Sequence, residues 1–257
     1  MASPATQTGP PDAATQPARA PANYKQLDSD QIVATCEQLC RRIQERFPSA
    51  GLNNCSGQLL QISRQAKVRA AQISEPMTWL RVLSGLAIAS IVSVFVVTLM
   101  QVQLKDEELH SGEMVQIFEA GFNTLVLVGA IILFLVTLEI RVKRRRALKA
   151  IHELRSLAHI IDMHQLTKDP DRTRTRADDT ASSPKRTMTP FELNRYLDYC
   201  SEMLSLSGKV AALYVQNFED ADAVAAVNDL EELASGLSRK IWQKIMMLNT
   251  VREDGAK

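Results

Sequence analysis

Residues 79–100 (WLRVLSGLAIASIVSVFVVTLM) and 120–140 (AGFNTLVLVGAIILFLVTLEI) decide the fold of this chain. Each segment is as long as the ~20 apolar residues that cross the hydrocarbon core of a bilayer as one helix. A short acidic connection separates the two segments, and the basic run 141–146 (RVKRRR) follows the second. The pattern predicts a two-span transmembrane hairpin.

Both spans are expected to remain in the mature protein. The first begins far from the N-terminus and is longer than the roughly 7–15-residue core of a signal peptide. Outside the spans, no run of alternating β-branched or aromatic residues bounded by Asn-Gly or Gly-Gly turns is present. The sequence therefore predicts an all-α protein in which a two-span transmembrane helical hairpin carries a cytoplasmic helical bundle.

The flanking charges predict the orientation of the hairpin. Loops on the cytoplasmic side carry an excess of lysine and arginine. Basic residues lie just before the first span and just after the second, whereas residues 101–119 hold one lysine against five acidic residues. We expect both termini on the cytoplasmic side of a plasma or inner membrane.

The rest of the chain divides by composition and apolar periodicity. Residues 1–27 are rich in Ala, Pro, Thr and Gln, with too little apolar surface to offset the entropy of ordering, and should form a disordered tail. The segments expected after it are cytoplasmic amphipathic helices at 28–76, the hairpin at 77–141, a stem helix at 142–167, a flexible linker at 168–188, an αα-hairpin at 189–250 and a tail at 251–257.

Local patterns predict the bounds and inner faces of the helices outside the hairpin. The first helix, capped by residues 28–30 and ending at Pro48, has an apolar stripe at Ile32, Cys36, Leu39, Ile43 and Phe47. The second covers about 56–75, with its stripe at Leu59, Ile62, Ala66, Ala70 and Ile73. Thr189 and Glu192 predict a capping box for a helix that ends near residue 217, and Asp220 is expected to cap the last helix.

The spans offer few polar groups. Neither has a charge in its middle third, which disfavours a transporter or proton relay. Gly85, Ala89 and Ser93 form a row of small residues that predicts close packing between spans. The basic run supplies a stop-transfer signal. It is also predicted to contact anionic lipid, at roughly 1 kcal/mol per charge, through Arg141, Lys143, Arg144, Arg145 and Arg146.

No glycine or proline occurs between residues 130 and 169, so span 2 should continue as one helix to about residue 167. In this stem an apolar face lies beside a polar ladder at i, i+3, i+7 and i+10. The ladder consists of His152, Arg155, His159 and Asp162.

Three interpretations of the ladder stay open. It could be a buried polar seam that fixes register and oligomeric state. It could be a ligand- or pH-sensing site, because histidine titrates near neutrality. A metal or catalytic site is the weakest of the three, since His152 and His159 lie two turns apart, about 10 Å along the axis, and no CxxC or HExxH motif is present. No cofactor or metal is expected, and Cys36 and Cys40 are expected to be buried thiols.

Residues 189–257 hold 11 acidic and 7 basic side chains, a net charge of −4 that disfavours nucleic acid as a partner. No nucleophile–base pattern indicates an enzyme. The sequence favours a membrane-anchored helical scaffold or signalling and interaction module, with homo-oligomerisation and a cytoplasmic protein partner bound through residues 189–250. The layout of leading helices, two spans and trailing helices is similar to that of two-span effector families of bacterial defence systems. That resemblance implies, as the alternative, an oligomeric pore-forming or membrane-perturbing effector.

Overall fold

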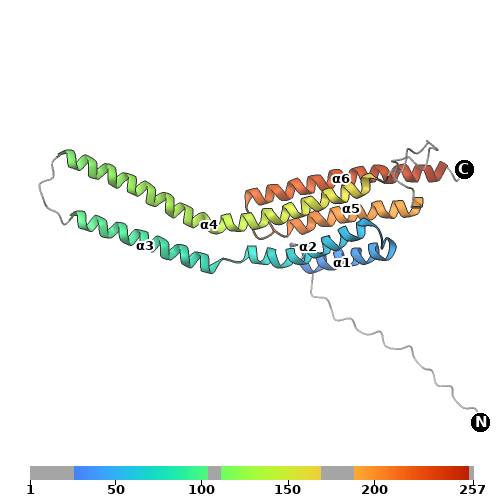
Figure 1. The fold of residues 1–257 in the computed structure, drawn as a ribbon, viewed down its shortest axis with the longest axis horizontal. Helices are drawn as coiled ribbons and strands as arrows, with labels where there is room; N and C mark the ends of the chain where they lie inside the picture. Colours follow the sequence, from blue (N-terminus) through green and yellow to red (C-terminus); the bar gives the residue numbers. More distant parts are fainter. Residues whose placement is uncertain (1–25, 104–110, 169–187, 255–257) are drawn as a thin grey trace, which may run out of the picture.

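The computed structural model describes residues 26–103, 111–168 and 188–254 (Figure 1). All regular secondary structure in these ranges is helical, which confirms the all-α prediction. The six helices are α1 (Ser29–Arg46), α2 (Gly51–Ser74), α3 (Thr78–Gln103), α4 (Ser111–Leu166), α5 (Pro190–Ala212) and α6 (Ala221–Asp254). The predicted tail falls almost wholly, and the predicted linker mostly, outside the described residues.

Helix α4 is the axis of the molecule. It has 56 residues, about 84 Å at ~1.5 Å per residue, and it confirms that span 2 and the stem form one helix. It begins nine residues before the predicted span, at Ser111, so the connection between the spans is shorter than the sequence suggested. Its first half lies beside α3, and its second half runs through the bundle (Figure 1).

Helix α3 and the first half of α4 extend together away from the other helices (Figure 1). Their apolar segments are long and apolar enough to cross a membrane, by length and composition. None of the described side chains between residues 81 and 142 is buried. The most apolar part of the molecule therefore has the least internal packing.

The second half of α4 contacts α2, α5 and α6, while α1 packs against α2 and α5. One core joins these five helical segments, so helices that precede and follow the apolar hairpin are packed together. The predicted inward stripe of α1 is buried in full, at Ile32, Cys36, Leu39, Ile43 and Phe47. In α2 the stripe is confirmed at three of its five positions, whereas Ile62 and Ala70 are only partly buried.

The helix starts in the bundle follow from capping chemistry. Asp28 accepts hydrogen bonds from the backbone N–H groups of Asp30 and Gln31 at the start of α1. Thr189 and Glu192 form the predicted capping box of α5. Asp220 accepts from the N–H of Ala223 at 3.1 Å and starts α6, also as predicted.

Two helix bounds differ from the expected ones. Helix α2 begins at Gly51 rather than near residue 56. Helix α5 ends at Ala212 rather than near 217, because the N–H of Tyr214 bonds to the carbonyl of Ala211 and tightens the chain into turns.

Candidate functional site: the junction of the apolar hairpin and the bundle

The hairpin presents apolar side chains to its surroundings on all sides. Leu127 and Leu133 of α4 are 62% and 66% exposed, and Leu86 of α3 is 65% exposed. Soluble proteins rarely leave apolar surface of this extent uncovered. The surface is suited to contact with lipid or with another apolar helix.

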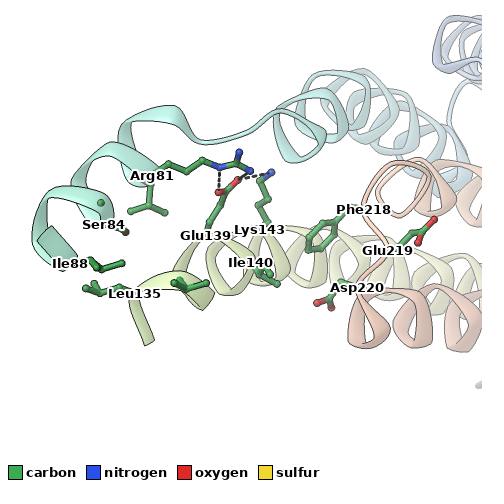
Figure 2. Close-up of a pocket in the computed structure, with 13 residues that line it drawn as sticks. Arg81, Ser84, Ile88, Leu135, Glu139, Ile140, Lys143, Phe218, Glu219 and Asp220 are labelled. Atoms are coloured by element: carbon green, nitrogen blue, oxygen red, sulfur yellow. Dashed lines mark hydrogen bonds and ion pairs between the residues drawn. The ribbon is translucent and has the colours of Figure 1, made fainter. Parts of the chain in front are cut away.

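The small-residue row of α3 is exposed, with open space at Gly85. Gly85, Ala89 and Ser93 are all exposed, and a Cβ added at Gly85 would meet no atom within 4 Å. Ser84, Gly85 and Ile88 of α3 line a space between α3 and α4, and Figure 2 shows Ile88 next to Leu135. Span packing along the Gly85 row stays a prediction.

A carboxylate on α4 ties the start of α3 to α4. Glu139 accepts two hydrogen bonds from Arg81, at 2.6 Å from Nε and 3.3 Å from Nη2. It also accepts from the backbone N–H of Met77 at 3.2 Å, and Lys143 lies 3.1 Å away, one turn further along α4. Figure 2 shows Arg81 and Lys143 converging on Glu139. Arg81 of α3 and Met77 just before it are thereby tied to Glu139 of α4 where α3 leaves the bundle.

The basic run is divided between two roles. Lys143 is buried against Glu139, and Arg144 bonds to Asp220 at 2.8–2.9 Å and to Asp222 at 2.6 Å. Both Lys143 and Arg144 thus pair with carboxylates at the junction, while their predicted contact with anionic lipid stays a prediction. Arg141, Arg145 and Arg146 are exposed, and the guanidinium of Arg141 lies over the ring of Phe134.

The pair between Arg144 and Asp220 connects α4 to the start of α6. Asp220 also caps α6, and its side chain is only 4% exposed. One carboxylate therefore both starts α6 and holds it against the end of the hairpin. Sequence analysis identified the cap but not the ion pair, because the two residues are 76 positions apart.

A cavity of about 630 Å³ opens beside these contacts, between α3, α4 and the connection from α5 to α6 (Figure 2). Ile88, Leu135 and Val136 line its hairpin end. Arg81, Glu139 and Lys143 line it where α3 and α4 meet the bundle, and Phe218, Glu219 and Asp220 close the remaining side.

The predicted stem ladder is placed on the outer surface of the bundle. His152, Arg155 and His159 are exposed and Asp162 is half-buried, so these residues form no buried seam within the chain. Arg155 lies 4.0 Å from Asp229 of α6, and Asp162 accepts a hydrogen bond from Gln165 at 2.6 Å. The apolar face of the stem is confirmed, since Ile151, Leu154, Ala158 and Ile161 are buried.

The buried polar contact of the stem lies at its end instead. Gln165 is 1% exposed, and its side-chain oxygen accepts a hydrogen bond from Lys244 at 2.7 Å. Lys244 also donates to the backbone carbonyls of Gln165 and Lys168, at 2.8 and 3.2 Å. A cation at the carboxyl end of a helix stabilises its unpaired carbonyls. Nothing in the local pattern pointed to this contact, which joins α4 to α6.

The four cysteines are free thiols. Cys36, Cys55 and Cys200 are buried and Cys40 is partly exposed, so the expectation of buried thiols holds for Cys36 and in part for Cys40. Burial raises the pKa of the Cys200 thiol well above its ordinary value. Across the described residues, no three His, Cys, Asp or Glu side chains converge as a metal site would require.

Comparisons with known proteins identify no relative of this chain. The chain matches no protein-family model, and no curated protein and no solved structure is detectably similar to it. Its function must be argued from its own residues.

Proposed function

We propose that the chain is an integral membrane protein whose two apolar helices anchor a helical scaffold or interaction module on the cytoplasmic face. The observation that carries the proposal is the contrast in burial: among the described side chains of the two apolar segments only Leu80, at the bundle end of α3, is buried, whereas the amphipathic helices beside them share one core. Apolar surface that nothing in the chain covers is stable in hydrocarbon.

The distribution of charge supports the orientation. The exposed arginines Arg141, Arg145 and Arg146 lie where α4 leaves the apolar segment, at the level expected of an anionic lipid surface. The bundle would then lie directly under the membrane, with both termini in the cytoplasm.

The bundle offers a surface for a protein partner at its far end. Trp242, Met246 and Met247 of α6 are 58%, 58% and 50% exposed. Exposed aromatic and methionine side chains are typical of binding surfaces. They support the proposal that residues 189–250 bind a cytoplasmic protein, in a role that is not enzymatic.

The alternative is an oligomeric pore-forming or membrane-perturbing effector. One observation favours it: Gly85, Ala89 and Ser93 are exposed, and a Cβ added at Gly85 would meet no atom within 4 Å, so the row has room for a helix of another copy. A pore predicts ion leakage on overexpression that is lost when Gly85 and Ala89 are replaced by leucine. A scaffold predicts no leakage.

The anchoring proposal is tested by labelling with a membrane-impermeant maleimide in intact cells. The Lys105→Cys variant, in the connection between the spans, should label from outside. The Ser235→Cys variant, at an exposed position of α6, should label only after permeabilisation. The parent chain controls for the native thiols. Labelling of both variants on the same side, or release of the chain by alkaline carbonate, would refute the proposal.

A further inference from the structure

We propose that the junction cavity binds one glycerophospholipid, with its phosphodiester held by Arg81 and Lys143 and an acyl chain lying between α3 and α4. The inference rests on the proposed function, because it takes the hairpin to lie in a bilayer. It goes further by assigning a specific lipid site rather than general contact with the membrane.

The shape and lining of the cavity fit an amphiphile. Its volume of about 630 Å³ is in the range of small-molecule sites, roughly 300–1,000 Å³. Ile88, Leu135 and Val136 make one end apolar, and Arg81 and Lys143 make the other end charged (Figure 2). The polar end lies where the hairpin meets the bundle, which is the depth of lipid headgroups if the apolar segments span the hydrocarbon.

Arg81, Lys143 and Glu139 at the polar end carry a net charge that one anion would neutralise. Arg81 and Lys143 share a single carboxylate, Glu139, so the three groups carry one excess positive charge. A phosphodiester carries one negative charge. The guanidinium has five N–H donors and the ammonium three, and the bonds to Glu139 use only two of the guanidinium nitrogens, Nε and Nη2. Arg81 is also 62% exposed and can reach a ligand in the cavity.

The remaining wall disfavours a more highly charged ligand. Glu219 and Asp220 line the side formed by the connection from α5 to α6, and Glu219 is exposed. Asp220 shares Arg144 with Asp222, so this wall is net acidic, and Glu219 would repel any anionic group beyond the phosphodiester held by Arg81 and Lys143. The site therefore favours a lipid with one phosphodiester and no further anionic group.

The test uses the full chain, purified in detergent, stripped of lipid and examined by native mass spectrometry. Three probes separate the sources of binding: dioleoylphosphatidylcholine, dioleoylglycerol without the phosphate, and water-soluble glycerophosphocholine. We expect one copy of phosphatidylcholine to bind, and the other two probes to bind at least tenfold more weakly. Equal binding of dioleoylglycerol would overturn the role of the phosphodiester, and equal binding of glycerophosphocholine that of the acyl chain.

Variants test the residues. Arg81→Gln should weaken phosphatidylcholine binding about tenfold, as expected for one lost charge-assisted hydrogen bond. The matched variant Arg145→Gln removes an exposed arginine outside the cavity and should leave binding unchanged. Glu139→Gln raises the excess charge and should bind at least as tightly as the parent. If Glu139→Gln weakens binding as much as Arg81→Gln does, the three groups serve only as an ion pair and the proposal fails.

Leu135→Trp fills the apolar end without touching the charges, and it should also weaken binding at least tenfold. Circular dichroism of each variant establishes that the helices are intact, and unchanged binding by folded Leu135→Trp would refute the acyl site. Carbonate extraction separates the two proposals. A parent chain released by carbonate refutes membrane anchoring, whereas a chain that stays in the membrane yet binds no phosphatidylcholine refutes only the lipid site.

Discussion

The two halves of α4 differ more than any other pair of regions in the molecule, although they belong to one helix. None of the described side chains between residues 119 and 142 is buried, whereas Leu154, Ala158 and Ile161 in the second half are fully buried. In the first half, residues 125–136 are apolar around the whole circumference of the helix, whereas the second half is apolar on one face. The difference teaches that periodicity, rather than apolar content, decides which part of a long helix finds a partner within its own chain.

The largest expected effect comes from matched truncations in the two halves. Leu154→Ala should lower the free energy of unfolding of the bundle by about 2–5 kcal/mol, because Leu154 is 0% exposed and leaves a cavity. Leu133→Ala, at a position 66% exposed, should change it by less than about 0.5 kcal/mol. Urea unfolding in detergent, followed by circular dichroism, measures both. Equal losses would mean that the two halves do not differ in packing.

The second-largest loss of stability is expected at the boundary between the two halves of α4. Asp220→Ala removes the cap of α6 and the partner of Arg144, and should cost about 2–3 kcal/mol. Asp222→Ala removes the other partner of Arg144, but Asp222 is 60% exposed, so the cost should stay below about 1 kcal/mol. The same unfolding experiment compares them, and similar losses would show that burial of the pair is unimportant.

A smaller effect is expected where the packed half ends. Lys244→Met removes three hydrogen bonds to Gln165 and Lys168 and should destabilise the bundle by about 1–2 kcal/mol. Hydrogen exchange should become faster in the last turn of α4, because its carbonyls lose their donor. Lys240→Met, at an exposed position, is the control. Unchanged hydrogen exchange in the Lys244→Met variant would show that apolar packing alone, without the hydrogen bonds from Lys244, stabilises the last turn of α4.

The smallest effect depends on pH and is confined to the bundle. Hydrogen bonds from the backbone N–H and the hydroxyl of Thr189 lower the pKa of Glu192 below its ordinary value. A lowered pKa adds stability above the ordinary pKa, and that stability is lost as pH falls through the folded value. The first turn of α5 should therefore fray below about pH 4, with the hairpin helices unchanged. Hydrogen exchange with carboxyl NMR measures this, and a Glu192 pKa at or above the ordinary value would contradict it.

The sequence predicted the features that rest on local pattern. The inward stripe of α1, the capping box at Thr189 and the uninterrupted α4 were all correct, because each depends on residues within a few turns of one another. The partner of the Gly85 row could not be predicted in this way. In a span that is apolar on every side, no periodicity indicates which face meets the partner helix.

The site could be predicted only in part. The sequence showed that the run at 141–146 is basic. It did not show which of its charges form ion pairs within the chain, because Asp220 lies far from Arg144 in the sequence. A buried seam was one of three interpretations of the stem ladder, and within the chain the apolar face beside it supplies the core and leaves His152 and His159 outside. The contact between Lys244 and Gln165 had no signal, since it depends on how α6 lies across the end of α4.

The two routes between hairpin and bundle have different stiffness. Helix α4 passes from one region to the other as a rigid rod, whereas α3 is separated from α2 by the break at Glu75 and Pro76. The unbroken α4 is therefore the stiffer of the two connections between the hairpin and the bundle, and Glu139 and Arg144 lie on it where the two regions meet. If the hairpin spans a bilayer as proposed, a tilt of its outer end would reach α5 and α6 through α4 rather than through α3.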